Sequence, residues 1–207
     1  MTRGQFIVFE GLDGAGTSTQ IELLATHLRA RGNDVQVTHE PTDGPVGRLI
    51  RQVLRGEVEL PPAALALLFA SDRLDHLEGR DGVRAALEAG RSVLSDRYLL
   101  SSVAYQAADG LEPDWVVAIN RHAIAPDLTI FLDVTPEVCM QRIEARGGQP
   151  ERFETLERLR RVDARFRAHL DQPELTGALI TVDGHGPIAA VAASIEERVD
   201  GWLSARI

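Results

Sequence analysis

The residues best placed to do chemistry lie near the N-terminus, in the glycine-rich stretch "FEGLDGAGTSTQ" at residues 9–20. Gly11, Gly16 and Ser18 match the phosphate-binding loop pattern Gly-x-x-x-x-Gly-Lys-Ser/Thr. In such a loop, backbone N–H groups face the phosphates, the N-terminus of the next helix adds partial positive charge, and the hydroxyl binds Mg²⁺. The stretch therefore predicts a site for a nucleotide phosphate, and a glycine-rich turn without a ligand is the alternative.

Thr17 stands where this pattern has a lysine that reaches toward the β- and γ-phosphates. All 22 basic residues of the chain are arginines, so the missing lysine belongs to a chain-wide absence. Thr17 is not an arginine either, which means that a positive charge is absent at this position. Because that charge normally neutralises the transferring phosphoryl group, we expect another cation to supply it.

A second candidate group, "SDRY" at residues 95–98, ends a β-rich run. Asp96 places a carboxylate beside the guanidinium of Arg97, and the two could organise a metal ion, a phosphate or both. A structural ion pair would have the same sequence, so the residue types leave both interpretations open.

A third group lies in "LLFASDR" at residues 67–73. Phe69 and Arg73 are four residues apart, so on a helix they share one face and offer a ring for a base and a fork for a phosphate. The alternatives are a core position for Phe69 and a salt bridge from Arg73 to Asp72 or Asp75 on a solvated face. The stretch predicts either a nucleotide-binding face or an ordinary amphipathic helix.

Five short β-rich runs alternate with amphipathic segments and must position these groups. The runs are "QFIVF", "VQVTH", "RSVLSD", "LTIFLDV" and "ALITVD". Such alternation predicts an α/β fold in which crossover helices join parallel strands. The first run leads directly into the glycine loop, and a helical pattern follows it and ends at Gly32. Ligands bind at the carboxyl ends of such strands, where polar residues gather in this chain.

Length and composition limit the classes of function. At 207 residues and 44% hydrophobic, the chain has the size of one α/β domain. The net charge of −9 and the absence of a basic run argue against a nucleic-acid polymer as partner. Cys139 is the only cysteine, which excludes an internal disulfide and predicts a small buried helix residue. No leader and no span of about 20 apolar residues is evident, so we expect a cytoplasmic protein without a membrane segment.

Taken together, these segments resemble the thymidylate kinase family over nearly the whole chain. The matching segments, in order, are "FIVFEGLDGAGTSTQ", "HEPTDGPVGRLIR", "LLFASDR", "DRYLLSSVAYQ", "IFLDVTPEVCMQRIEARG", "ERFE" and "VDGHGPI". The resemblance implies a three-layer P-loop NTPase fold, with a five-stranded parallel sheet flanked by helices and a short lid. It also implies transfer of the γ-phosphoryl group of ATP to dTMP with Mg²⁺, in an enzyme that is commonly a homodimer.

On the donor side, the resemblance implies that the glycine loop, one arginine and the segment 182–187 bind ATP. The implied ATP-binding residues are Gly11, Leu12, Asp13, Gly14, Ala15, Gly16, Thr17, Ser18, Thr19, Arg142 and Asp183. Ser18 and Asp13 are the implied metal residues, and Asp13 also approaches the acceptor nucleotide.

On the acceptor side, the implied dTMP-binding residues are Glu40, Pro41, Arg51, Phe69, Arg73, Arg97, Ser102, Tyr105 and Gln106. Arg51 and Arg97 resemble the forks that hold the acceptor phosphate. Phe69 would stack on thymine, Arg73 would contact its edge, and Ser102 and Gln106 would hydrogen-bond around the base. Tyr105 resembles the ring that crowds the sugar 2′ position. The loop "EPTDG" departs from the more usual glycine-rich form.

A lid at about residues 146–153 carries Arg146 and Arg152, where one branch of the family keeps its catalytic arginines. Its "GGQP" sequence could permit closure over the site, although an exposed turn has the same composition. We expect these two arginines, with Arg97 and Asp13, to be the catalytic residues, and the lid to replace the charge missing at Thr17. No general base is assigned, because phosphoryl transfer depends on positioning and charge neutralisation.

Two alternatives to an active dTMP kinase remain at this stage. One is a nucleotide-binding pseudokinase with both pockets but little turnover. The persistence of Asp13, Ser18, Arg97 and the two lid arginines favours an active enzyme over this alternative. The other is a kinase for another nucleoside or nucleoside monophosphate, against which Phe69 and the "DRYLLSSVAYQ" segment favour thymidylate.

Overall fold

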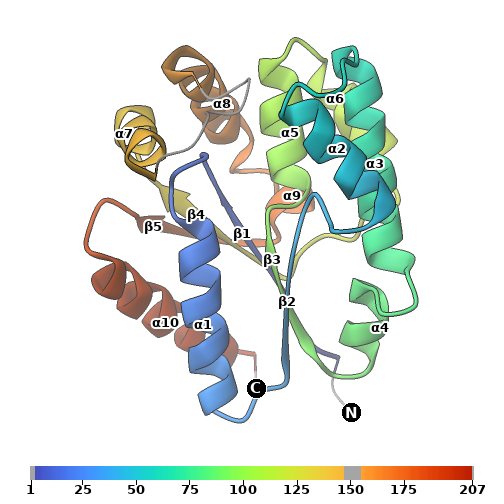
Figure 1. The fold of residues 1–207 in the computed structure, drawn as a ribbon. Helices are drawn as coiled ribbons and strands as arrows, with labels where there is room; N and C mark the ends of the chain where they lie inside the picture. Colours follow the sequence, from blue (N-terminus) through green and yellow to red (C-terminus); the bar gives the residue numbers. More distant parts are fainter. Residues whose placement is uncertain (1–2, 147–154, 207) are drawn as a thin grey trace.

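The computed structural model describes residues 3–146 and 155–206, which contain one five-stranded sheet (Figure 1). The strand order is β2-β3-β1-β4-β5, and every neighbouring pair is parallel. The strands are β1 (Phe6–Gly11), β2 (Val35–His39), β3 (Ser92–Asp96), β4 (Leu128–Asp133) and β5 (Ala178–Asp183). They coincide with the five β-rich runs of the sequence, so the predicted parallel α/β sheet is confirmed.

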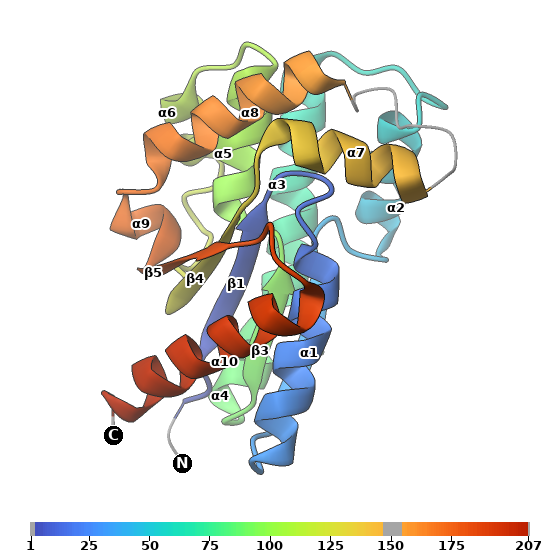
Figure 2. The ribbon, with the colours of Figure 1, turned by 90° about the vertical axis from the view of Figure 1, so that its left-hand side faces the viewer.

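Helices connect the strands and cover both faces of the sheet, which gives three layers (Figures 1 and 2). Their bounds are α1 (Thr17–Ala30), α2 (Pro45–Leu54), α3 (Pro62–Glu78), α4 (Val83–Glu88), α5 (Leu99–Ala108), α6 (Pro113–Ile119), α7 (Pro136–Arg146), α8 (Leu156–His169), α9 (Pro173–Thr176) and α10 (Ile188–Ser204). Helices α1 and α10 pack together on one face, and α5 and α8 pack together on the other. Helix α3 packs beside α5 and α2.

The core is centred on β1 and β4. All six residues of β1 are buried, as are the first five of β4. Strands that are buried along almost their whole length are typical of parallel sheets covered on both faces. Phe166 of α8 packs on Phe131 of β4 with ring centroids 5.4 Å apart, which fixes α8 over the sheet. The rigid centre therefore presents the carboxyl ends of β1, β3 and β4 side by side.

Two smaller expectations can be checked in the fold. Cys139 is fully buried on α7 as predicted, and burial raises the pKa of its thiol to about 12. Within residues 3–146 and 155–206, no helix is both long and apolar enough to cross a membrane.

Candidate active site

The glycine loop links the end of β1 to the start of α1, which is the strand–loop–helix context that the sequence predicts. Gly14 and Gly16 have φ values of 85° and 100°, in the region that favours glycine. A Cβ atom on Gly14 would also lie 2.6 Å from the carbonyl oxygen of Cys139. The loop conformation therefore requires glycine at these positions. It also leads into the N-terminus of α1, and a helix N-terminus is a place where an anion can bind.

Ser18 and Asp96 meet at the carboxyl ends of β1 and β3. The Ser18 hydroxyl donates to Asp96 Oδ2 at 2.5 Å, while the other carboxylate oxygen, Oδ1, is buried without a hydrogen-bond partner in the described chain. Mg²⁺ is usually bound by one or two carboxylates together with substrate phosphates. A hydroxyl beside a carboxylate with an unpaired oxygen fits this ion, so Ser18 and Asp96 could hold it.

Asp13, the second residue predicted for the metal, points into a different cluster. Its Oδ1 accepts from Arg97 Nη2 at 2.7 Å, and its Oδ2 accepts from the Tyr105 hydroxyl at 3.0 Å. The Tyr105 oxygen in turn accepts from the Asp13 backbone N–H at 3.1 Å. Asp13 therefore connects the glycine loop to the side chains of the neighbouring pocket.

Arg97 lies directly after β3 with φ 69°, an uncommon conformation for a residue with a side chain. This backbone turns the guanidinium toward the loop, where Nη1 donates to the Gly11 carbonyl at 3.2 Å and to the Ser101 hydroxyl at 3.1 Å. Burial alone would lower the pKa of Arg97, but nearby acidic groups, including Asp13, raise it above its usual value. The guanidinium therefore stays charged between the loop and the pocket.

Glu10 is a buried carboxyl that the sequence analysis missed. It lies near the end of β1 and accepts hydrogen bonds from the backbone N–H groups of Tyr98 (3.0 Å) and Ser101 (3.1 Å) and from the Ser101 hydroxyl. Burial raises the pKa of Glu10 to about 7, against the opposing effects of these hydrogen bonds and of Arg97. The one sequence signal was an acidic residue in an otherwise apolar strand.

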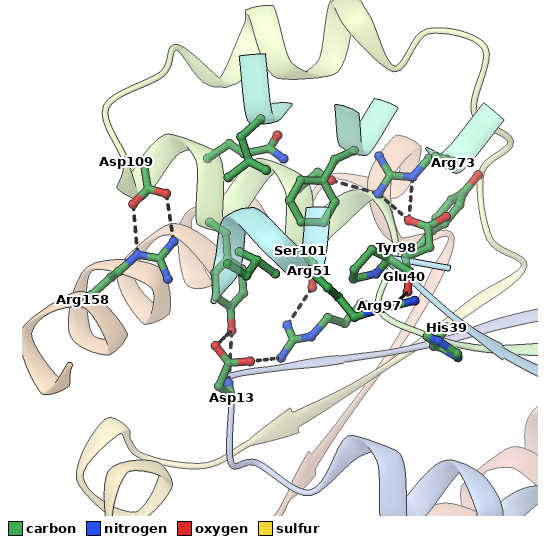
Figure 3. A pocket seen from close by; sticks show the side chains of 17 residues that line it. Asp13, His39, Glu40, Arg51, Arg73, Arg97, Tyr98, Ser101, Asp109 and Arg158 are labelled. Atoms are coloured by element: carbon green, nitrogen blue, oxygen red, sulfur yellow. Dashed lines mark hydrogen bonds and ion pairs between the residues drawn. The ribbon is translucent and has the colours of Figure 1, made fainter. Parts of the chain in front are cut away.

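A pocket of about 270 Å³ opens beside the glycine loop, between α2, α3, α5 and α8 (Figure 3). It is lined by Asp13, His39, Glu40, Pro41, Arg51, Leu54, Leu65, Phe69, Arg73, Arg97, Tyr98, Ser101, Ser102, Tyr105, Gln106, Asp109 and Arg158. All nine residues predicted for dTMP are among them. The structure thus brings together in one cavity residues that are spread from position 40 to position 106 of the sequence.

Arg73 is fully buried and forms the centre of a polar network in the pocket wall. Its Nη2 and Nε donate to Glu40 Oε2 at 2.6 and 3.0 Å, Nη2 also donates to Ser102 Oγ at 2.9 Å, and Nη1 donates to Asn120 Oδ1 at 2.5 Å. Its guanidinium also stacks on the Tyr98 ring, 4.9 Å from the centroid. The alternative of a solvated salt bridge to a neighbouring aspartate is therefore wrong.

Asp72, one of those aspartates, instead holds the loop after β2. Its carboxylate accepts from the Thr42 backbone N–H and from the Thr42 hydroxyl, both at 2.7 Å. Arg51 of α2 binds the same loop through the Pro41 and Thr42 carbonyls at 2.7 and 2.6 Å and through Asp43 at 2.7 Å. The loop is fixed from two helices, although its sequence lacks the more usual glycines.

Two guanidinium groups lie close to the Tyr105 ring. Arg97 is 5.0 Å and Arg158 5.4 Å from the centroid of its ring. Arg158 in turn forms a bidentate pair with Asp109, through Nε to Oδ1 at 3.0 Å and Nη2 to Oδ2 at 2.8 Å (Figure 3). The sequence analysis missed Asp109 and Arg158, because nothing in the sequence brings positions 49 residues apart together.

On the donor side, Arg142 of α7 joins the glycine loop to the segment after β5. Its guanidinium donates to the carbonyl oxygens of Ala15 at 3.1 Å and Gly184 at 2.9 Å. Asp183 accepts from the His185 backbone N–H at 3.0 Å and pairs with its Nδ1 at 2.5 Å, contacts that lower the pKa of the Asp183 carboxyl. The residues predicted for the ATP side are therefore neighbours in space.

The structure describes only the first residue of the predicted lid. Arg146 is the exposed last residue of α7, whereas Arg152 and residues 147–153 lie outside the described residues. Thr17 is the first residue of α1 and is buried. The position where a lysine is usual therefore lies at the start of α1. The cation that would replace the lysine stays a prediction.

A glycine loop before the first helix of a 2-3-1-4-5 parallel sheet, with a Ser–Asp pair and an arginine-lined pocket beside it, defines a P-loop nucleotide kinase. The family model for thymidylate kinase matches residues 9–195.

Curated relatives give the same result. A probable thymidylate kinase of Thermococcus kodakarensis is 45% identical over 165 residues, 76% of this chain and 80% of the relative. A thymidylate kinase of Desulfotalea psychrophila is 40% identical over 166 residues, 80% and 81% of the two chains. A thymidylate kinase of Alkalilimnicola ehrlichii is 39% identical over 218 aligned positions, 99% and 98% of the two chains. The chain belongs to the thymidylate kinase family and is an ATP-dependent phosphotransferase.

Proposed function

We propose that the pocket of Figure 3 is the acceptor site for dTMP, and that the γ-phosphoryl group of ATP passes to dTMP at the junction of this pocket and the glycine loop, giving dTDP. The observation that carries the proposal is the position of Arg97. Its guanidinium lines the pocket and also donates to the Gly11 carbonyl of the loop at 3.2 Å. A phosphate bound by Arg97 would therefore lie next to the phosphates of a nucleotide on the loop.

In this proposal, Arg97 and Arg51 hold the acceptor phosphate and Asp13 fixes the direction of the Arg97 fork. Holding both phosphates in one geometry supplies much of the rate in such reactions, because little covalent chemistry is required of the protein. Ser18 and Asp96 would hold Mg²⁺, which when bound neutralises charge on the ATP phosphates. Asp13 would contribute to the metal site only indirectly, since both of its oxygens are engaged.

The base would lie against Phe69 and near the amide of Gln106. Gln106 is buried, and its Oε1 has no hydrogen-bond partner within the described chain. A buried amide oxygen without a partner is costly, so a thymine N–H would satisfy it. Arg73 and Ser102 line the same wall, and their mutual bond at 2.9 Å would present a fixed edge to the base.

The chain would form one domain, with a lid at about residues 146–153. The charge missing at Thr17 would come from Arg146 and Arg152 of this lid. The support is the sequence of the lid and the position of Arg146, at the end of α7 on the donor side of the site. Arg142 of the same helix is bound to two carbonyl oxygens and would mainly shape the loop. A cytoplasmic location stays a prediction from the sequence.

We also propose a homodimer. Helix α3 exposes Leu67 and Leu74, two turns apart on one face, to 51% and 37%, and Trp115 of the contacting helix α6 is exposed to 36%. Apolar side chains gathered on neighbouring helices are typical of a surface that another protein covers. A second copy of the chain is the occupant that the family resemblance favours.

A coupled assay of ADP release, with ATP, Mg²⁺ and a panel of nucleoside monophosphates, tests the proposed function. We expect dTMP to be the best acceptor, dUMP to be about ten- to a hundredfold weaker because it lacks one methyl contact, and UMP to be almost inactive. Equal or faster turnover of dCMP, AMP or GMP would contradict the assignment of the pocket to dTMP.

A further inference from the structure

The Tyr105 side chain has contacts at its hydroxyl and also at its ring. The hydroxyl is fixed by Asp13, the Arg97 guanidinium lies 5.0 Å from the ring centroid, and the Arg158 guanidinium lies 5.4 Å from it. Phe166 of α8 adds an edge contact with centroids 6.0 Å apart. Arg97 and Phe166 also act in the phosphate site and in the core, and Arg158 joins the ring to the Asp109 carboxylate.

Arg158 is well placed to fix the ring. It lies in the first turn of α8, where the Thr155 side chain caps the helix by accepting from the Arg158 backbone N–H at 3.3 Å. Its side chain is 12% exposed, and both arms of its fork bind the Asp109 carboxylate. Burial would lower the pKa of Arg158, but the hydrogen bonds and the charge of Asp109 raise this pKa above its usual value. The guanidinium therefore stays charged.

Asp109 is bound to α5, the helix that carries Tyr105. It follows α5 directly, and its backbone N–H donates to the Tyr105 carbonyl at 3.1 Å. The guanidinium of Arg158 therefore spans one helical turn of α5, from the carboxylate of Asp109 to the face of Tyr105. A bidentate pair of this kind is directional, and a cation on an aromatic face is attracted to it, so together they oppose rotation of the ring.

We propose that Arg158 and Asp109 are positioning residues that hold the Tyr105 ring against the acceptor sugar and thereby set how strongly the enzyme excludes a ribonucleotide. The inference rests on the proposed function, which places the sugar 2′ position at Tyr105. A hydroxyl at that position needs space that only a displaced ring can provide. Fixing the ring makes the displacement unfavourable, while a deoxyribose does not require it.

The test compares dTMP with its ribonucleotide, 5-methyluridine 5′-monophosphate, which has the same base and phosphate. We expect Arg158→Leu to lower the ratio of kcat/KM for dTMP to that for the ribonucleotide by about tenfold, the scale of one cation–π contact in a partly buried site. Most of the change should come from faster use of the ribonucleotide. Arg161→Leu is the matched control, because Arg161 lies on the same helix in an exposed pair with Glu157.

A merely structural role for Arg158 would lower thermal stability and leave the ratio unchanged, and that result would overturn the inference. If Arg158→Leu does not fold, Asp109→Asn serves instead, because it keeps the size of the side chain and should lower the ratio by about threefold through a weakened pair.

Tyr105→Ala separates the inference from the proposed function. If Tyr105→Ala lowers the ratio and Arg158→Leu does not, the inference is wrong and the placement of the sugar stands. If Tyr105→Ala leaves the ratio unchanged, the sugar does not lie at this ring, and the proposed acceptor geometry is wrong as well.

Discussion

The acceptor pocket and the glycine loop lie next to each other but are held by different kinds of contact. In the pocket, arginines bind buried or half-buried carboxylates, as Arg73 binds Glu40 at 2.6 Å and Arg158 binds Asp109 at 2.8 Å. The loop depends on backbone conformation, and it carries Thr17 where a lysine is usual. The pocket therefore has its positive charge held by paired carboxylates, whereas we expect the loop to receive charge from elsewhere.

This difference separates two tasks of the enzyme. A pocket whose side chains are already paired can select and align the acceptor with little rearrangement. A loop that lacks its cation leaves the transferring phosphoryl group to be neutralised by groups that arrive with the nucleotide or close over it. Substitutions on the donor side should accordingly change the chemical step, and substitutions in the pocket should change acceptor binding and alignment.

The largest effect is expected on the donor side, at Arg152. Arg152→Ala should lower the single-turnover rate by about 10³-fold and change the affinity for ATP little, because its contact would form mainly in the transition state. Thr17→Lys in that background should recover part of the loss, and Arg160→Ala, which removes an exposed pair with Glu137, is the control. If Arg152→Ala and Arg146→Ala both leave the chemical step unchanged, the lid does not replace the missing lysine.

The second effect concerns Glu10, under the junction of pocket and loop. Its pKa is raised from 4.5 to about 7, chiefly by burial, so the folded protein holds this proton more tightly than the unfolded chain does. The resulting cost to stability is absent below about pH 4.5, grows as the pH rises, and is fully present above about pH 7, where it reaches roughly 3 kcal/mol.

Chemical denaturation across this pH range measures the effect. The free energy of unfolding of the wild type, relative to Glu10→Gln, should fall by about 3 kcal/mol between about pH 4.5 and pH 8. Glu22→Gln, at an exposed position of α1, should follow the wild type at every pH. Parallel curves for wild type and Glu10→Gln would mean that Glu10 titrates normally.

The smallest of these effects is expected at the base. Gln106→Leu removes the buried amide that we assign to thymine and should lower kcat/KM for dTMP by about tenfold, the scale of one hydrogen bond to a buried group. Gln52→Leu, at an exposed position of α2, is the control. An unchanged preference for dTMP over the other monophosphates in Gln106→Leu would place the base elsewhere in the pocket.

The sequence predicts the parts of this molecule that depend on local pattern. The β-rich runs, the loop glycines and the spacing of Phe69 and Arg73 each reflect constraints within a few residues, and the structure confirms them. The resemblance to a family adds the acceptor residues, which meet in one pocket. Their convergence follows from a parallel sheet, which brings the carboxyl ends of separate strands to one edge.

The pairings that the sequence analysis missed depend on contacts between distant segments. The Ser18–Asp96 bond joins positions 78 residues apart, and the Arg158–Asp109 pair joins positions 49 apart. Helical spacing could not tell that Arg73 faces a buried carboxylate, because an amphipathic pattern does not identify what covers each face of a helix. Such pairings come from packing in three dimensions, where a buried charge requires a partner that the local sequence does not reveal.

Arg97 lines the pocket and contacts the glycine loop, so its substitution tests the account most directly. Arg97→Lys keeps the charge and loses the fork that reaches Asp13 and the Gly11 carbonyl. Steady-state kinetics should give a fall in kcat/KM for dTMP of about a hundredfold, while Arg91→Lys, in an exposed pair with Asp34, keeps the wild-type value. Wild-type kinetics in Arg97→Lys would contradict the account, because Arg97 would then be only a structural partner of Asp13.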